Sequence, residues 1–263
     1  PITVMNEQMP YKIKINTIDS KCTYAPVKNV KVNITGKATT GEIYNEEKVS
    51  NEDGIIESDD LLQRGDVDYT ITQISVPTGY VKGSNQTLKI NKDWDTTQIT
   101  LRETIPNVVI DNVNKTIILT LYMEPQTFNI NLSKVDKLDN NIKVANAKFV
   151  LNQPNFEKGT SRKEYTQVTK SDSNLVFTGE VAGEGIYKFT LTESVVPTGY
   201  IALSKETNLL ITFNSDGIVT KVDQETDNDN VKIGELNEEN VIPLQIANEK
   251  KVHSLKITAT NEE

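Results

Sequence analysis

The chain has 263 residues, of which 25% are charged and 36% are hydrophobic, and its formal net charge at pH 7 is −9. This length suits one large domain or two ordinary ones, and the absence of an apolar run of membrane-spanning length predicts a soluble protein. The acidic balance, with only three arginines, argues against a nucleic-acid-binding protein, because such proteins need clustered cations.

Cysteine and histidine each occur once, as Cys22 and His253. A single cysteine allows no internal disulfide, and a single histidine removes most hydrolase triads and zinc sites. The composition therefore argues against an enzyme, and we expect neither a cofactor nor a metal ion. The ends show no targeting or anchoring pattern, so the chain is either cytosolic or a section of a longer protein.

Two-residue alternation of apolar and polar side chains dominates the sequence and predicts half-buried antiparallel strands. The clearest alternating segments are 11–15, 128–132 and 189–192. Turn signals rich in Asp, Asn and Gly occur at 52–54, 139–141 and 215–217. No segment has sustained helical periodicity, so the predicted fold class is all-β.

The sequence also repeats itself. Residues 69–80 recur as residues 189–200, a spacing of about 120, and both copies end in Val-Pro-Thr-Gly-Tyr. Residues 118–123 correspond to residues 243–248. Two tandem repeats of this size fit the chain, and each is large enough for one β-sandwich core.

The repeat frame extends past both ends of the chain, since residues 1–6 resemble 243–248 and residues 254–259 resemble the opening strand of a repeat. The predicted organisation is a final strand of a preceding repeat or a linker at 1–8, domain 1 at 9–125, domain 2 at 126–250, and a first strand of a following repeat or a tail at 251–263.

Three polar residues of the second repeat continue apolar stripes and are therefore expected on the buried face. They are Lys134, after Phe128, Ile130 and Leu132; Glu193, after Phe189 and Leu191; and Asn248, after Leu244 and Ile246. Buried, unpaired charges are costly, so such groups become neutral or find partners. If the three strands converge, a neutral Lys134 amine could attack the Asn248 carboxamide, polarised by a protonated Glu193, and release ammonia.

The second repeat resembles the Cna protein B-type (CnaB-like) domains of Gram-positive surface adhesins and pilins. The resemblance rests on Lys134-Val-Asp136, on Phe189-Thr-Leu-Thr-Glu193 followed by Val196-Pro-Thr-Gly-Tyr200, and on Ile246-Ala-Asn248. It implies a prealbumin-like, inverse-Ig β-sandwich, an intramolecular isopeptide bond between Lys134 and Asn248 promoted by Glu193, and a stalk role at the cell surface or cell wall.

The first repeat departs from this pattern at all three positions, where Thr17, Gln73 and Met123 replace the Lys, the Glu and the Asn. Its other first-strand lysines, Lys12 and Lys14, have outward parity. We therefore predict the same fold without an isopeptide bond. For the second repeat, Asn261 is the runner-up acceptor if the last strand lies at 254–261.

Two other interpretations remain open. Lys134 could extend to the sheet edge and form an ordinary salt bridge with Glu193. The chain could also be an adhesin module that binds a host matrix protein or glycan, through loops around 36–50 or 153–165.

Arg64-Gly65-Asp66 reads as an integrin-binding tripeptide, although Gly65 occupies a turn position that structure alone explains. Apart from such a host partner, the expected partners are neighbouring repeats of the same polypeptide.

Overall fold

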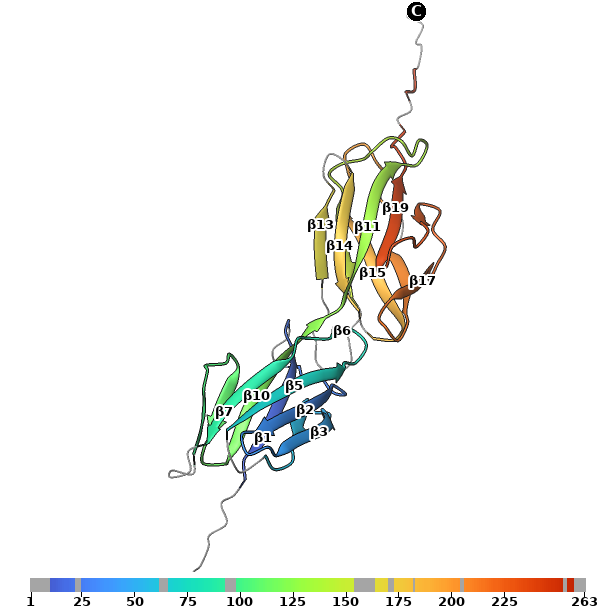
Figure 1. Ribbon diagram of the computed structural model, residues 1–263. Helices are drawn as coiled ribbons and strands as arrows, with labels where there is room; N and C mark the ends of the chain where they lie inside the picture. Colours follow the sequence, from blue (N-terminus) through green and yellow to red (C-terminus); the bar gives the residue numbers. More distant parts are fainter. Residues whose placement is uncertain are drawn as a thin grey trace, which may run out of the picture. The chain divides into compact units, whose positions relative to one another are not determined.

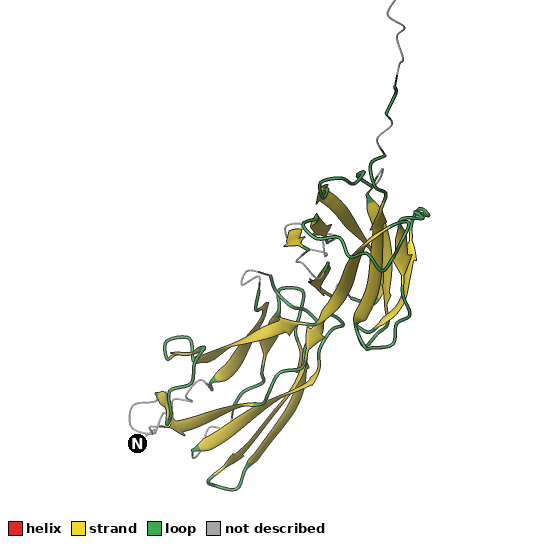
Figure 2. Ribbon diagram, turned by 90° about the horizontal axis from the view of Figure 1, so that it is seen from above, coloured by secondary structure: helices red, strands yellow, loops and turns green. Residues whose placement is uncertain are grey.

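The computed structural model describes residues 10–21, 25–61, 66–92, 98–153, 164–169, 173–181, 183–203, 206–252 and 255–257. Its regular secondary structure is entirely β-strand in these residues (Figure 2), which confirms the predicted fold class. No helix in the described part of the chain is long and apolar enough to cross a membrane. The chain divides into two compact units, Pro1–Gln126 and Thr127–Glu263 (Figure 1).

Unit 1 is a sandwich of two sheets. The first sheet contains β4 (Ile55–Glu57), β1 (Lys12–Asp19), β10 (Thr116–Pro125) and β6 (Tyr80–Val81) in that order, with β9 (Val108–Asp111) also paired to β10. The second sheet contains, in order, β3 (Ile43–Val49), β2 (Lys31–Ala38), β5 (Val67–Ser75), β7 (Gln86–Lys92) and β8 (Ile99–Leu101).

Unit 2 has the same arrangement, except that its described residues contain no strand equivalent to β6. Its first sheet contains, in order, β14 (Asn174–Glu180), β11 (Thr127–Asp136), β19 (Val241–Asn248) and β18 (Val231–Ile233). Its second sheet contains, in order, β13 (Glu164–Val168), β12 (Lys148–Asn152), β15 (Gly185–Val195), β16 (Thr207–Phe213) and β17 (Val219–Gln224). The shared strand order explains the sequence repeat, because equivalent strands occupy equivalent places in both sandwiches.

The first and last strands of each unit are neighbours and run parallel, β1 beside β10 and β11 beside β19 (Figure 1). The expectation of antiparallel strands is therefore wrong for these two pairs, although the other ladders are antiparallel. The physical reason is that no hairpin joins the first strand to the last. About a hundred residues separate them, and a parallel pair needs only a long connection.

Each unit has its own hydrophobic core, formed by alternate residues of the facing sheets. In unit 2 the β11 residues Phe128, Ile130 and Leu132 are at most 1% exposed, as the alternation predicts. Three phenylalanines, Phe128, Phe189 and Phe213, pack edge to face at the centre of this core.

The repeated Pro-Thr-Gly-Tyr segment is a β-turn in both units. The Tyr80 amide donates to the Pro77 carbonyl over 3.2 Å, and the Tyr200 amide donates to the Pro197 carbonyl over 3.1 Å. The third residue of each turn is a glycine at positive φ, 97° for Gly79 and 87° for Gly199. This is the type II geometry, which requires a residue that tolerates the left-handed region.

The expected strands at the chain ends are not seen as strands. Residues 1–8 lie outside the described residues. At the other end, residues 251–252 and 255–257 are described without regular structure, and Val252, Leu255 and Ile257 are more than 80% exposed. The assignment of both ends to neighbouring repeats stays a prediction.

Candidate crosslinking site

Lys134 lies in the core of unit 2, where β11 approaches its end. Its side chain is fully buried, as the alternation predicts, and its backbone amide donates to the Ser173 carbonyl over 2.9 Å. Within the described residues, the Nζ atom has one hydrogen bond, 3.4 Å long, to the Val135 carbonyl. The amine is thus shielded from solvent and is not extended to the sheet edge.

Asn248 lies at the end of β19, beside Lys134. The register pairs Lys134 with Ile246 and Asp136 with Asn248, so Lys134 and Asn248 share a face and are two positions apart. Strand rise and spacing place such Cα atoms about 8 Å apart, a distance that a lysine and an asparagine side chain can span together. The side chain of Asn248 is 1% exposed, and its Oδ1 has no hydrogen-bond partner in the described structure.

Glu193 reaches the same place from the opposite sheet, on β15. Its carboxylate accepts two hydrogen bonds from Asn248 Nδ2, both 2.9 Å long, and Oε2 also accepts the Leu203 amide over 3.5 Å. Glu193 is half-buried. The carboxamide and the carboxyl group that the sequence singled out are therefore in direct contact.

A β-bulge lies directly after Glu193. Phe149 pairs with Glu193 and Lys148 pairs with Val195, so Ser194 is the extra residue on β15. Unit 1 has the same bulge after Gln73, since Val32 pairs with Gln73 and Lys31 with Ser75. A bulge bends its strand and redirects the adjacent side chain. Sequence reasoning missed this feature, which carries no composition signal.

The electrostatic environment favours the neutral amine of Lys134. Burial lowers the pKa of Lys134 from 10.5 to about 8, and the negative charges of Glu193 and Asp136 oppose this shift in part. Desolvation dominates because the ammonium loses its water shell in the core. A larger fraction of Lys134 is therefore an unprotonated nucleophile near neutral pH than for an exposed lysine.

In unit 1, the three positions equivalent to Lys134, Glu193 and Asn248 carry uncharged side chains. Gln73 Oε1 accepts the Gly83 amide over 2.8 Å, and Gln73 Nε2 lies 3.8 Å from Met123 Sδ. Thr17 donates its hydroxyl to the carbonyls of Val27 and Gly54 at 2.5 and 3.0 Å. All three side chains are at most 4% exposed, so the site is buried but lacks the lysine, the glutamate and the asparagine of unit 2.

A second trio of side chains adjoins the site in unit 2 and was not singled out from sequence. Asp136 is 1% exposed, and its Oδ2 accepts the Tyr200 hydroxyl over 3.1 Å and forms an ion pair with Lys250 at 3.0 Å. The hydrogen bond that Lys250 donates to Asp136 holds the pKa of Asp136 below its usual value. In unit 1, Tyr80 donates to Asp19 over 2.9 Å. The recurrence of Tyr in both Pro-Thr-Gly-Tyr segments was the available signal.

The remaining sequence expectations have varied outcomes. Residues 36–50 are not a loop but chiefly β2 and β3, joined by a short turn at 39–42, because residues 43–49 pair antiparallel with β2. Most of 153–165 lies outside the described residues, as do Cys22, Arg64, Gly65, His253 and the runner-up acceptor Asn261.

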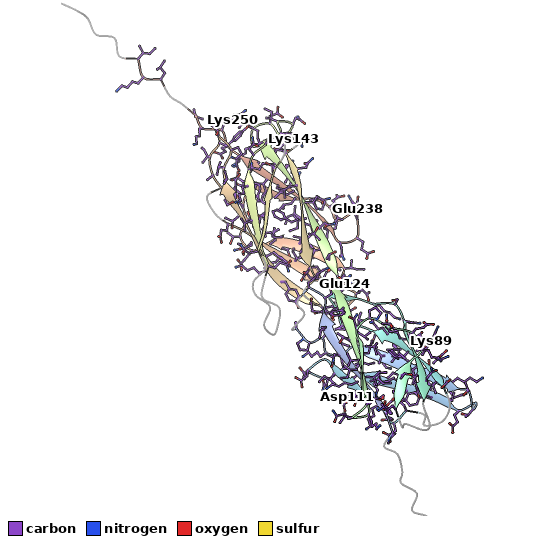
Figure 3. The ribbon with its side chains drawn as sticks, turned by 90° about the vertical axis from the view of Figure 1, so that its left-hand side faces the viewer. Lys89, Asp111, Glu124, Lys143, Glu238 and Lys250 are labelled. Atoms are coloured by element: carbon purple, nitrogen blue, oxygen red, sulfur yellow. The ribbon has the colours of Figure 1, made fainter. Side chains whose placement is uncertain are left out.

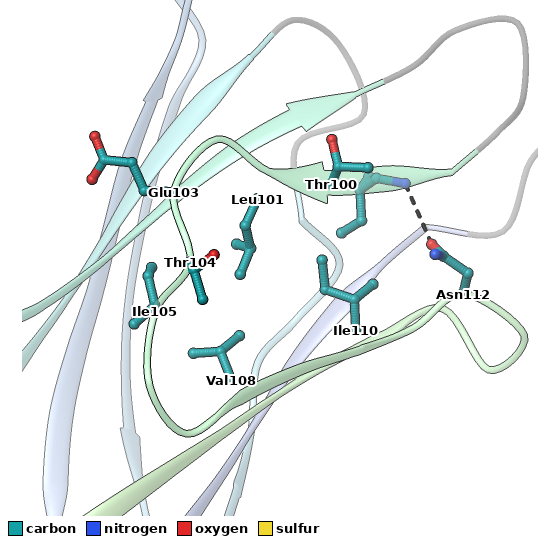
Figure 4. Close-up of a pocket in the computed structure, with 9 residues that line it drawn as sticks. Thr100, Leu101, Glu103, Thr104, Ile105, Val108, Ile110 and Asn112 are labelled. Atoms are coloured by element: carbon teal, nitrogen blue, oxygen red, sulfur yellow. Dashed lines mark hydrogen bonds between the residues drawn. The ribbon is translucent and has the colours of Figure 1, made fainter.

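Unit 1 also has a groove of about 380 Å³ between β8 and β9 (Figure 4). Its walls include Leu101, Ile105, Val108 and Ile110, which pack against the unit 1 core, and the Ile99 amide donates to Asn112 Oδ1 over 3.4 Å. These side chains close the core at the edge of the sandwich.

Comparison with known proteins supports the fold. Residues 11–105 match the family model of the SpaA prealbumin-like fold domain, which confirms the predicted prealbumin-like sandwich for unit 1, and unit 2 has the same strand order. A search of curated proteins found no match. The CnaB-like resemblance of unit 2 in particular stays a prediction.

Solved structures give similar folds at low sequence identity. The Bacillus anthracis TIE protein is 18% identical with a TM-score of 0.52, over 92% of this chain and 34% of that protein. The pilus adhesin SpaC from Lactobacillus rhamnosus GG is 14% identical with a TM-score of 0.52, over 92% of this chain and 31% of that one. The chain thus spans about a third of each protein, and the likeness establishes a shared tandem β-sandwich fold.

Proposed function

We propose that this chain is a structural stalk segment of a Gram-positive cell-surface adhesin or pilus-like protein, in which an autocatalytic Lys134–Asn248 isopeptide bond stabilises unit 2. The observation that carries the proposal is the contact between the Asn248 carboxamide and the Glu193 carboxyl group in the same core that buries Lys134. The proposed role is non-enzymatic, because each molecule reacts once with itself.

The chemistry joins two side chains and releases ammonia. The Lys134 amine attacks Asn248 Cγ, the new Nζ–Cγ bond forms, and the Cγ–Nδ2 bond breaks. A proton first passes from the Lys134 ammonium to the Glu193 carboxylate. Glu193 in this acid form polarises the carboxamide, which needs only a rotation of the amide group to present Oδ1, and then passes a proton to the departing nitrogen. The proton lost from Nζ restores the acid, so the balance is one amine and one amide giving one substituted amide and one ammonia.

The bond would connect the strand by which the chain enters unit 2 to the strand by which it leaves. It would close a loop of roughly 114 residues. The resulting loss of chain entropy in the unfolded state would stabilise the unit by about 5 kcal/mol. A pull on the two ends of the unit would then act on a covalent link between β11 and β19 instead of on their hydrogen-bonded ladder.

The proposal extends to the organisation of the chain. Domains at 9–125 and 126–250 would be two successive repeats of an array, with the residues beyond them contributed to neighbouring repeats. Unit 1 would lack a bond, since Thr17, Gln73 and Met123 supply none of the three reactive groups. The partners of each unit would be the adjacent repeats of the same polypeptide, and the protein would be located on the outer surface of the cell. Pilus function is proposed by analogy with the fold-level neighbours.

The test is the intact mass of the purified chain. We expect a mass lower than the sequence value by one ammonia, and by only one. Lys134→Ala and Asn248→Ala should each restore the sequence mass, and Glu193→Gln should slow the loss by about 10²- to 10⁴-fold, the usual contribution of a general acid or base. Thr17→Ala in unit 1 is the matched control and should keep the loss. A wild-type chain at its full sequence mass would refute the proposal, and two losses would refute the account of unit 1.

A further inference from the structure

On or just after each strand that carries a crosslinking residue lies one polar residue of a second side-chain cluster. On β11, Asp136 follows Lys134 by two positions; after β19, Lys250 follows Asn248 by two; and after β15, Tyr200 follows Glu193 by seven. These three residues, here called the Asp136 cluster, contact one another through the Asp136 carboxylate. One small cluster therefore connects all three segments on which the reaction depends.

The carboxylate of Asp136 is fully engaged. Its Oδ1 accepts the amides of Leu138 and Asp139 at 2.9 and 3.3 Å, while Oδ2 accepts Tyr200 and pairs with Lys250. A buried carboxylate with this many partners has a fixed orientation, because any rotation would break several of these bonds at once. Asp136 is thus a rigid point of attachment next to Lys134.

Backbone hydrogen bonds surround the acceptor in the same region. The Asn248 carbonyl accepts the Lys137 amide over 3.0 Å, the Glu249 carbonyl accepts the Ile201 amide over 2.8 Å, and the Lys251 amide donates to Gly199 over 2.8 Å. The residues on the C-terminal side of Asn248 therefore lie against the Pro-Thr-Gly-Tyr turn. Lys250 lies at the end of unit 2, where Lys143 is also located (Figure 3).

Unit 1 supplies a natural contrast. It keeps the Asp19–Tyr80 hydrogen bond, but the position equivalent to Lys250 is Pro125, two residues after Met123. The Asp–Tyr contact therefore belongs to the fold, whereas a lysine two residues after the last strand's core position occurs in the unit that has the reactive triad. A purely structural role for the cluster gives no reason for this difference.

We propose that Asp136, Tyr200 and Lys250 are positioning residues for the crosslinking reaction, and that they hold the Asn248 carboxamide within reach of the Lys134 amine and the Glu193 carboxyl group. This inference rests on the proposed function. Correct placement of reacting groups supplies much of the rate of an intramolecular reaction, and a displacement of about 1 Å can cost about 10²-fold.

The experiment measures the rate of ammonia loss in the full chain. The chain is synthesised in a cell-free translation system, samples are quenched in acid at intervals, and intact mass gives the crosslinked fraction. The variants are Tyr200→Phe, Lys250→Met and Lys250→Arg, with Tyr80→Phe in unit 1 as the matched control. Circular dichroism at the assay temperature gives the folded fraction, to which each rate is normalised.

We expect Tyr200→Phe and Lys250→Met to slow crosslinking by about tenfold or more, Lys250→Arg to restore most of the rate, and Tyr80→Phe to leave it unchanged. Rescue by Arg separates positioning from packing, because Met fills the space without the charge. If Tyr200→Phe does not fold, the two Lys250 variants test the proposal, because the Lys250 side chain is half exposed and its substitution should not prevent folding.

The outcomes separate the two proposals. A wild-type chain that never loses ammonia refutes the proposed function itself. A wild-type chain that crosslinks, with folded Lys250→Met and Tyr200→Phe variants that crosslink equally fast, refutes the positioning role alone. Equal slowing by Met and Arg at position 250 refutes the role of the cation.

Discussion

At the scale of the residue, the two units differ in the side chains at three equivalent positions, which are buried in unit 1 and buried or half-buried in unit 2. Unit 1 places Thr17 where unit 2 places Lys134, and Thr17 satisfies its hydroxyl on two backbone carbonyls. Lys134 has a single weak hydrogen bond within the described structure and pays a desolvation penalty. A buried lysine is thus a poor choice for stability alone, and the proposed reaction, which removes its charge, would account for its presence.

The titration of Lys134 gives a testable pH dependence. In Asn248→Ala the amine stays free, with a folded-state pKa of about 8 against 10.5 in the unfolded chain. Between these values the unfolded chain binds more protons than the folded one, so the free energy of unfolding rises with pH. Below about pH 8 the folded state carries the full cost of the buried charge. Denaturant unfolding of unit 2 from pH 7 to 10 measures this rise.

The control for this prediction is the double variant Lys134→Met/Asn248→Ala, which lacks the buried amine but keeps all other titrating groups. Its stability should rise less over the same pH range. The wild-type chain should also show a smaller rise, because the proposed crosslink would convert the amine to an amide. Identical slopes in the two variants would contradict a desolvated amine at position 134.

At the scale of the element, a turn and a bulge position the site. The bulge at Ser194 lies beside Glu193, and the type II turn that follows brings Tyr200 to β11 and Gly199 to the residues after β19. Both features recur in unit 1, so they are part of the fold. Unit 2 uses them to bring a carboxyl group from one sheet to the end of a strand pair in the other.

Gly199→Ala tests the turn. Its φ of 87° lies in the left-handed region, and an added Cβ would meet nothing within 4 Å, so the cost is conformational and not steric. We expect unit 2 to lose about 1–2 kcal/mol of stability, measured by denaturant unfolding in the Lys134→Ala background.

Gly41→Ala is the matched comparison, because Gly41 has a φ of 93° and equally open surroundings in unit 1. It should impose a similar cost on unit 1 and leave unit 2 unchanged. A Gly199→Ala variant as stable as its parent would show that the turn does not require a left-handed residue.

At the scale of the whole molecule, the two sandwiches have separate cores and separate ladders. We therefore expect two unfolding transitions in calorimetry. Asn248→Ala should lower the free energy of unfolding of unit 2 by up to about 5 kcal/mol, the loop-closure value. The transition temperature of unit 2 should therefore fall, and that of unit 1 should stay the same. A shift of both transitions would contradict independent units.

The equivalence of the two sites predicts that unit 1 can be converted. The triple variant Thr17→Lys, Gln73→Glu, Met123→Asn places the three reactive groups at matching register positions on β1, β5 and β10. We expect a second ammonia loss in intact mass, and a faster one when Pro125→Lys is added. A folded quadruple variant with a single loss would contradict the equivalence.

The sequence determined the features that depend on local pattern. Alternation identified an all-β chain and placed Lys134 and Asn248 on buried faces, and the repeated segment predicted two sandwiches, because side-chain direction in a strand follows from the two-residue period alone. The structure decided which strands are neighbours. The parallel pairing of β11 with β19, the bulge beside Glu193 and the contact of Asp136 with Tyr200 and Lys250 all join segments more than 40 residues apart or depend on their register. Such pairing is set by the closure of the whole sandwich, and no local stretch of sequence contains it.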